Sequence, residues 1–293
     1  MFSLFCAAAL SLALAAAPAP GSLDATAMPT DAQCHALPSL PRGRLPLRAG
    51  ERLEFTVDVL GGMKAGTLTM ETLPAERHDG VLTLPIAAHA QSTGLFSRLG
   101  KIDSRGISYL KPHDLHPASF HEDFLGTGGK YWTEVTFPTT SPRVVHVRFG
   151  DPKGVGVRAF PSGADALDAV GAFYYLRSID LKVGQPLCFD VYGARKLWRV
   201  WGKVEAREAV STPAGDFRTL RLSGLAARKD APTARREVHF WISEDGRRLP
   251  VAAVGDLEIG PMRAVLTEVG SGSSPRAARD RRPAPRGAAG WTE

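Results

Sequence analysis

Asparagine is missing from this sequence altogether, so no N-glycosylation site can occur. The G-x-S-x-G motif is also absent, which removes the nucleophile elbow of the α/β hydrolases. The glycine- and lysine-containing stretches 61–67 and 126–130 lack the residue order of a phosphate-binding loop and are typical of hairpin turns. We therefore predict neither a nucleophilic catalytic site nor a cofactor.

Positive charge is missing from the first residues, where a signal peptide usually carries it. The run Phe2–Ala17 is nevertheless apolar and uncharged, and it ends in small residues that suit a cleavage site. A retained membrane anchor is the alternative, although the run is slightly shorter than the stretch of about 20 apolar residues that spans a bilayer. We predict a signal peptide over residues 1–19, export to the periplasm or beyond, and no transmembrane span in the mature chain.

Basic charge is concentrated at the C-terminus. Residues 271–293 contain five arginines against two acidic residues, so this tail holds half of the formal net charge of +6. A nucleic-acid-binding protein places basic and aromatic residues together on a folded face. The sequence therefore argues against nucleic acid as a partner and predicts a disordered, Arg-rich tail over residues 271–293.

Cysteine is scarce, with three residues in the whole chain. Cys6 lies inside the expected signal peptide, which leaves Cys34 and Cys188 in the mature protein. An oxidising compartment allows such a pair to form a disulfide. Our hypothesis is that Cys34 tethers the N-terminal segment to the strand that contains Cys188, and the alternative is two free thiols.

In the remaining chain, apolar and polar residues alternate strongly, with a period of two. Residues 20–46 are rich in alanine and proline and are interpreted as a linker, and residues 47–270 as a single β-rich domain. Many short strands separated by turn residues predict a mainly β fold, with a long antiparallel sheet curled into an open barrel or half-barrel. The expected strands are 53–59, 67–73, 81–91, 106–110, 119–124, 131–137, 144–149, 187–192, 196–208, 217–222, 237–242, 249–254 and 262–269.

One segment departs from this period. Apolar residues at Leu167, Val170 and Tyr174 form a helical stripe, and Ser162 followed by Asp165 resembles a capping box. We predict a helix over residues 162–178, buried centrally against the sheet.

Two groups of side chains are candidates for a site. The ligand-binding candidates are Phe173, Tyr174, Arg177, Trp198 and Trp241, with core packing as the alternative for the aromatic residues and a buried ion pair as the alternative for the arginine. The metal-binding candidates are His113, His116, His121 and Asp123. Their spacing matches no zinc motif, and prolines mark the stretch as a surface loop and strand edge, so a metal site is the minor interpretation.

Five pieces of the sequence, in chain order, resemble the bacterial domain-of-unknown-function 3108 family. They are 50–55 together with 64–67, 92–97, 168–177, 212–217 and 241–251. The resemblance covers residues 47–270. It implies an exported, β-rich protein of unassigned function and brings no catalytic residues to transfer.

Our leading functional hypothesis is an envelope protein without enzymatic activity that binds an apolar or amphipathic, lipid-like ligand in the concavity of the sheet. It rests on the analogy with β-barrels that hold lipids. The alternatives are a structural or interaction module that docks on another envelope protein, and a metal-dependent envelope hydrolase that uses the histidine cluster.

Overall fold

The computed structural model describes residues 27–34, 36–41, 45–59, 61–137, 143–162, 165–257 and 260–271. The expected signal peptide, and the expected tail except for Ser271, lie outside the described residues. In the described part of the chain, no helix is long and apolar enough to cross a membrane.

Most described residues belong to strands. The strands are β1 (Glu51–Val59), β2 (Met63–Thr72), β3 (Glu76–His78), β4 (Val81–Ser92), β5 (Asp103–Leu110), β6 (Pro117–Gly126), β7 (Gly129–Thr136), β8 (Val144–Asp151), β9 (Gly154–Pro161), β10 (Ala166–Asp168), β11 (Pro186–Gly193), β12 (Lys196–Thr212), β13 (Gly215–Arg228), β14 (Ala231–Ser243), β15 (Pro250–Leu257) and β16 (Gly260–Ser271). The helices are the 3-10 turn η1 (Asp31–Gln33), α1 (Gly94–Leu99) and α2 (Ala169–Leu176).

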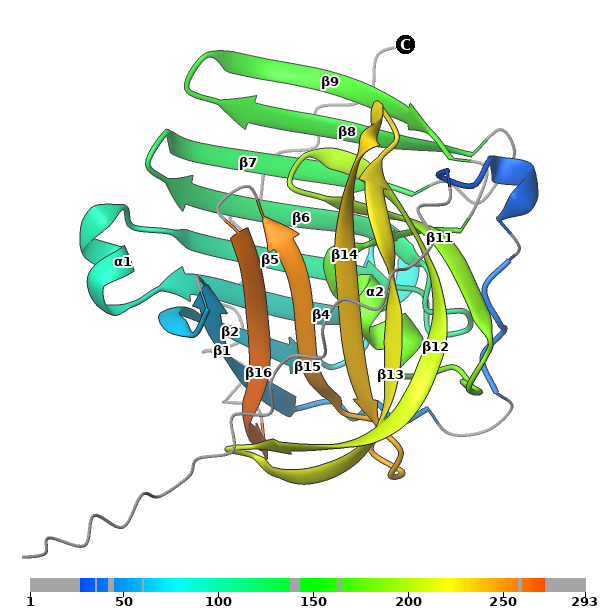
Figure 1. The fold of residues 1–293 in the computed structure, drawn as a ribbon. Helices are drawn as coiled ribbons and strands as arrows, with labels where there is room; N and C mark the ends of the chain where they lie inside the picture. The colour runs from blue at the N-terminus through cyan, green and yellow to red at the C-terminus, as the bar shows by residue number, and fades with distance from the viewer. Residues whose placement is uncertain are drawn as a thin grey trace, which may run out of the picture.

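The strands form one long sheet that curls around α2 (Figure 1). Their order is β10-β11-β12-β13-β14-β15-β16-β1-β2-β4-β5-β6-β7-β8-β9, with β3 paired to β4 alone. Neighbours are antiparallel except for β10 and β11. The sheet is not closed, because β9 and β10 are the two ends of this order in the described chain. The predicted mainly β fold, an open barrel with one central helix, is confirmed.

Alternation of side chains builds the core of the barrel. In β1, Leu53 and Phe55 are buried, whereas Glu54 and Thr56 are half-buried on the opposite face. Val145 and Val147 repeat this pattern in β8. On most strands one face thus contributes to a continuous hydrophobic cluster inside the curl. In β4 and β5 the opposite face is buried as well, because Ala87, Ile107 and Tyr109 form a second cluster with Leu73.

The central helix is shorter than predicted. It covers the eight residues Ala169–Leu176 and is capped by Asp168, whose carboxylate accepts a 2.8 Å hydrogen bond from the Gly171 amide. The preceding residues form β10, which pairs in parallel with β11. Ser162 does not cap the helix, because its hydroxyl donates a hydrogen bond to Asp190 at 2.8 Å. Over residues 166–168, strand pairing, a long-range contact, therefore takes the place of the predicted helix.

The stretch expected to be a linker packs, in its described residues, against the barrel. We call residues 27–41 the N-terminal segment. Leu37 is buried in the core, and its amide donates a 2.8 Å hydrogen bond to the Asp165 carboxylate. Cys34 and Cys188 form a disulfide, with their Cα atoms 5.2 Å apart. A covalent bond and a buried side chain therefore hold this proline-rich segment in place.

Candidate functional site

A cavity of about 750 Å³ lies inside the curl of the sheet. It is bounded by β1, β2 and β4 on one side, by β11–β16 on the other, and by one face of α2. Small-molecule sites typically measure about 300–1,000 Å³. The cavity is therefore large enough for a ligand with the size of a lipid chain or a drug-like molecule.

Small residues on neighbouring strands leave this space unfilled. Gly202 pairs with Gly224 across β12 and β13, and Gly224 and Gly255 both pair with Val238 of β14. A Cβ atom added at Gly202 would collide with the backbone of β13, and one at Gly224 with the backbone of β12. Glycine within a strand commonly marks such a close approach. This part of the wall therefore consists of backbone instead of side chains that would project into the barrel.

The helix α2 supplies the opposite wall. Ala169, Ala172, Phe173 and Leu176 line the cavity. The Phe173 ring stands edge-on against the ring of Phe240 from β14, with centroids 4.8 Å apart and planes at 86°. This contact joins the helix to the far side of the sheet and gives the cavity an aromatic corner.

The cap of α2 holds a buried acid. Asp168 is fully buried, and the Ser108 hydroxyl donates a hydrogen bond to its carboxylate at 2.6 Å. Burial raises the pKa of Asp168 to about 6, although the hydrogen bonds from Ser108 and Gly171 oppose the rise. The folded protein therefore binds this proton more tightly than the unfolded chain does.

We expect the stability contributed by Asp168 to depend on pH. Because its folded pKa exceeds its unfolded value, the contribution is complete below pH 4 and is lost as the pH rises through about 6. In Asp168→Asn this titration is absent, so the unfolding free energy of the variant relative to the parent should rise by about 3 kcal/mol between pH 4 and pH 8. Urea unfolding across this range measures the difference.

The exposed Asp216→Asn is the control for loss of one surface carboxylate. A constant difference between Asp168→Asn and the parent across the pH range would contradict a raised pKa.

The ligand-binding candidates from the sequence lie in different places. Phe173 lies on the cavity wall. Tyr174 is fully buried beside Arg177, and its hydroxyl is 3.5 Å from the hydroxyl of Thr72. Neither Trp198 nor Trp241 is among the lining residues.

Strand alternation explains the position of Trp241, whereas Trp198 shares a strand face with the lining residues Val200 and Gly202. Phe240 contacts α2 on the inner face, so Trp241 belongs to the outer face, where its indole donates a hydrogen bond to Glu208. The Trp198 indole donates to the carbonyl of Gly193 at 3.2 Å, and the Arg236 guanidinium lies over its ring. Ligand contact by Tyr174, Trp198 and Trp241 stays a prediction without support from the cavity geometry.

Sequence reasoning did not identify most of the apolar wall. It includes Leu187, Phe189, Val191, Val200 and Leu222. Within the expected strands such residues fall at every second position. This shared parity was the sequence signal that could have placed them on one face of the sheet. That signal becomes informative only when the register between the strands is known.

Arg177 lies at a buried junction of the fold. Its guanidinium pairs with Glu51 of β1 and donates to the carbonyls of Arg248 at 2.9 Å and Arg247 at 2.7 Å. The side chain has no solvent exposure, and Arg177 is not a lining residue of the cavity. Three of the five pieces that carried the family resemblance therefore meet at this one guanidinium, which joins β1, α2 and the turn before β15.

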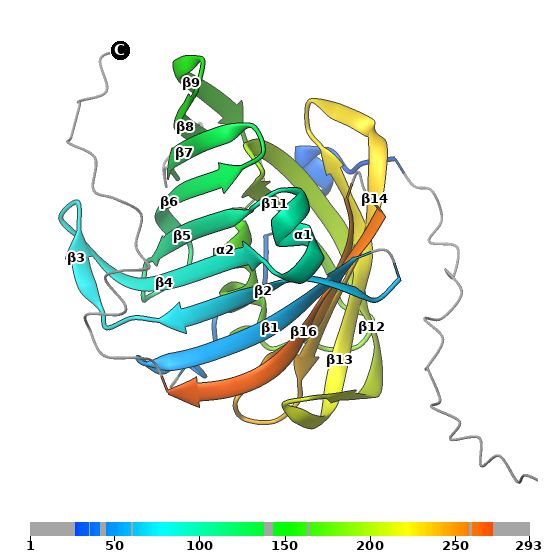
Figure 2. The same ribbon diagram turned by 90° about the vertical axis from the view of Figure 1, so that its left-hand side faces the viewer.

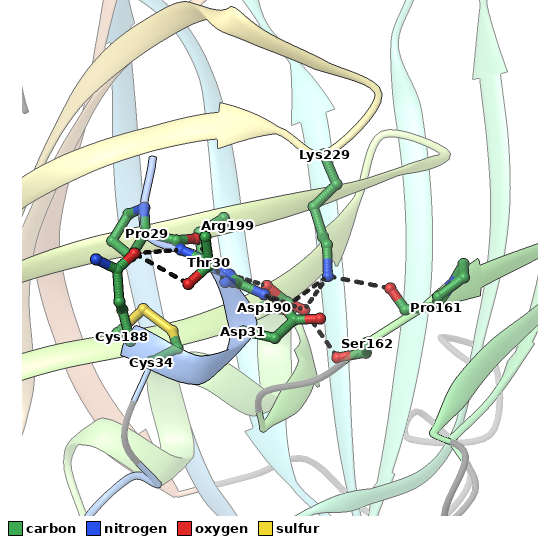
Figure 3. Close-up of polar contacts among 11 residues, drawn as sticks. Pro29, Thr30, Asp31, Cys34, Pro161, Ser162, Cys188, Asp190, Arg199 and Lys229 are labelled. Carbon is green, nitrogen blue, oxygen red and sulfur yellow. Dashed lines mark hydrogen bonds and ion pairs between the residues drawn. A yellow bond between two sulfur atoms is a disulfide. The ribbon is translucent and has the colours of Figure 1, made fainter. Parts of the chain in front are cut away.

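Side chains hold together the seam between the two ends of the strand order (Figure 3). Ser162, directly after β9, donates a hydrogen bond to Asp190 of β11 at 2.8 Å. Lys229, directly after β13, donates to the same carboxylate at 3.1 Å and to the carbonyl of Pro161 at 3.0 Å. Polar contacts therefore bridge β9 and β11, which no backbone ladder joins in the described chain.

The N-terminal segment completes this seam. Arg199, buried in β12, donates to Asp190 at 2.5 Å, to the carbonyl of Pro29 at 2.9 Å and also to Asp31. The Arg199 hydrogen bond lowers the pKa of Asp31, and the charge of Lys229 acts in the same direction. Because these charges are paired with one another, we interpret the cluster as a structural clamp.

The metal-binding candidates are dispersed. His113 has a side chain that is 74% exposed, whereas His116 lies beside a separate cavity of about 160 Å³, with its Nε2 atom 3.3 Å from Asp165. His121 packs edge-on against the Tyr109 ring. Among the described residues, no three His, Cys, Asp or Glu side chains are placed to hold one metal ion. The structure therefore does not bring His113, His116, His121 and Asp123 together.

Comparison with protein families identifies the chain. A family described as "Protein of unknown function (DUF3108)" matches residues 54–267. The chain belongs to this family, which confirms the resemblance found in the five sequence pieces. No curated protein matches the chain.

Three solved structures are similar in outline. A beta-barrel-like protein of the domain of unknown function DUF1849 from Brucella abortus aligns with a TM-score of 0.49 and 9% identity, covering 76% of this chain and 98% of that one. A protein from Bacteroides fragilis, described as exported and of YmcC-like fold, aligns with a TM-score of 0.38 and 8% identity. The alignment covers 80% of this chain and 100% of that one. A protein from Parabacteroides distasonis, described as a lipoprotein, aligns with a TM-score of 0.30 and 10% identity. The alignment covers 77% of this chain and 97% of that one. These likenesses are too low to transfer any property of those proteins.

Proposed function

We propose that this member of the DUF3108 family is an exported binding protein that holds an apolar or amphipathic, lipid-like ligand inside the curl of its sheet. The observation that carries the proposal is the cavity of about 750 Å³ with an almost entirely apolar wall. An apolar ligand gains free energy from leaving water in proportion to the apolar area that it buries. The binding energy of this site therefore comes from hydrocarbon surface.

The chemistry of the wall favours a chain-like ligand. Lys203 is the one Lys, Arg, Asp or Glu among the described lining residues, and it is exposed. Polar lining groups come from both sides of the cavity: Thr67, Gln91, Ser92 and Thr127 from β2, the end of β4 and the turn after β6, and Lys203, Ser223 and His239 from β12, β13 and β14. A few polar groups beside a large apolar wall suit a ligand with a long apolar body and a polar end.

Native mass spectrometry of protein purified from a periplasm without detergent tests the proposal. We expect a lipid-sized adduct on a chain that has lost residues 1–19. Uptake of a fluorescent fatty acid by the delipidated protein is the second measurement. A bare mass together with no uptake would refute ligand binding, and an uncleaved N-terminus would refute export through a signal peptide.

Filling the cavity should abolish uptake. Ala172 on α2 and Ala264 on β16 both line the space. In the double variant Ala172→Phe with Ala264→Phe, we expect affinity for the fatty acid to fall at least tenfold, because the rings occupy the volume that the ligand needs. The melting temperature should stay the same or rise, since added atoms in an apolar void gain dispersion contacts.

The matched control is Ala209→Phe, which adds the same ring at an exposed position of β12. We expect this variant to take up fatty acid as the parent does. Unchanged uptake by the folded double variant would place the ligand elsewhere.

A further inference from the structure

Three segments meet at the end of the barrel where α1 lies. They are 61–65 around the β1–β2 turn, 93–102 around α1, and 126–130 at the β6–β7 turn, and we call them together the portal rim. The Thr93 amide donates to the carbonyl of Ala65 at 2.9 Å, and Gly100 lies against the Thr127 methyl group, where a Cβ atom would collide. Figure 2 looks onto this end, with α1 between the arm of β4–β9 and the arm of β12–β16.

The cavity reaches solvent at the portal rim. Phe96, Ile102 and Thr127 all line the cavity. Ile102 is also 43% exposed, so the same side chain contacts both the cavity and water. The rim therefore borders an entrance.

Large apolar side chains are exposed around this entrance. Met63 is 49% exposed and Leu95 is 62% exposed, in addition to Ile102. Single exposed apolar residues are ordinary, but a group of them at one opening marks an interaction surface. Exposed methionine, leucine and isoleucine beside a hydrocarbon-lined cavity suit a partner that is itself hydrocarbon.

The charge of the portal rim has one sign. Its three segments contain Lys64, Arg98, Lys101 and Lys130 and no aspartate or glutamate. All four side chains are exposed, and none forms an ion pair within the described part of the chain. Apolar residues flanked by basic ones are typical of surfaces that insert shallowly into anionic bilayers.

We propose that the portal rim docks on the surface of an anionic lipid bilayer. Met63, Leu95 and Ile102 enter the headgroup region, and the four basic residues face the lipid phosphates. The cavity entrance then faces the membrane, so a lipid-like ligand passes between bilayer and cavity without crossing water. This last step rests on the proposed function, whereas the docking itself rests on the rim alone.

Co-sedimentation of the purified protein with lipid vesicles tests the docking. We expect binding to vesicles that contain phosphatidylglycerol, weaker binding to pure phosphatidylcholine, and loss of binding at high salt. The double variant Met63→Glu with Leu95→Glu, at two exposed rim residues that do not line the cavity, should bind at least tenfold more weakly. Lys64→Gln with Lys101→Gln should lose tenfold or more on anionic vesicles alone, because each basic residue strengthens such binding about fivefold.

The matched control is Val155→Glu with Val157→Glu, which places the same two charges on exposed valines of β9. It should bind vesicles as the parent does. The Arg-rich stretch 271–293 is identical in the parent and all variants, so its charge cannot cause a difference in vesicle binding between them. Equal binding by the rim variant and the β9 variant would overturn the proposal, as would equal binding of the parent to both kinds of vesicle.

Uptake of fluorescent fatty acid without vesicles separates docking from ligand binding. Rim variants should retain uptake, which also shows that they are folded, and the cavity-filled variant should lose uptake but still bind vesicles. A parent protein that takes up fatty acid without binding vesicles overturns the docking and leaves the proposed function intact. Vesicle binding through the rim without any uptake supports the docking and overturns the proposed function.

Discussion

Replacing Arg177 with methionine should lower the free energy of unfolding by about 3–5 kcal/mol, as is typical when one partner of a buried ion pair is removed. Methionine preserves much of the side-chain volume but leaves the Glu51 carboxylate and the carbonyls of Arg247 and Arg248 without their donor. A domain of this kind is stable by about 5–15 kcal/mol in total, so the loss is a large part of it. Urea unfolding followed by tryptophan fluorescence measures it.

The exposed pair of Arg207 and Glu244 provides the control for this experiment. Its side chains lie 2.7 Å apart, but the arginine is 59% exposed. Arg207→Met should therefore change stability by less than about 1 kcal/mol. If both arginine variants lose the same small amount, the buried junction does not hold β1, α2 and the turn before β15 together.

Removing the disulfide should have an effect of similar size. Cys34 and Cys188 are 154 residues apart in the sequence, and a cross-link of this span stabilises a protein by about 5 kcal/mol in the chain-entropy model. The bond also anchors the N-terminal segment, which places Asp31 beside Arg199. We expect Cys34→Ser with Cys188→Ser to unfold at much lower urea and the N-terminal segment to become sensitive to protease.

Measurements in a Cys6→Ser background confine the chemistry to these two thiols. Reducing agent should bring the unfolding midpoint of the parent down to that of the double serine variant and should leave the variant unchanged. A parent midpoint that does not respond to complete reduction would show that buried contacts, such as that of Leu37, suffice to fix the segment.

Local patterns predicted most of the sheet because most strands have one face in the core. Val145 and Val147 of β8 alternate with half-buried or exposed neighbours, and such a pattern reports the strand directly. The edge strand β9 was not predicted. Val155 and Val157 are exposed there and Gly156 separates them, so no buried face is visible in its sequence. Residues 166–168, inside the predicted helix, form β10 instead, because pairing with β11 is a contact that a local pattern does not contain.

The cavity depends on register, which the sequence does not display. Phe173 was identified from the helix, but the space in front of it exists because Gly202 of one strand faces Gly224 of the next, and Gly224 lies beyond the end of the predicted strand 217–222. The clamp at the seam is also long-range, since Asp31, Asp190 and Lys229 come from distant parts of the chain. No single residue of these groups stands out in the sequence. The cavity and the clamp become recognisable only when the fold brings the residues together.

The seam determines how the width of the barrel is controlled. In a closed barrel, strand number and shear fix the radius, since every strand is bonded on both sides. Here the last contacts between the β8–β9 hairpin and the β11–β12 hairpin are made by side chains, including the ring contact between Phe160 of β9 and Tyr192 and the ion pair between Asp151 of β8 and Arg195. Widening the barrel along this seam would therefore break side-chain contacts but no backbone ladder between described strands.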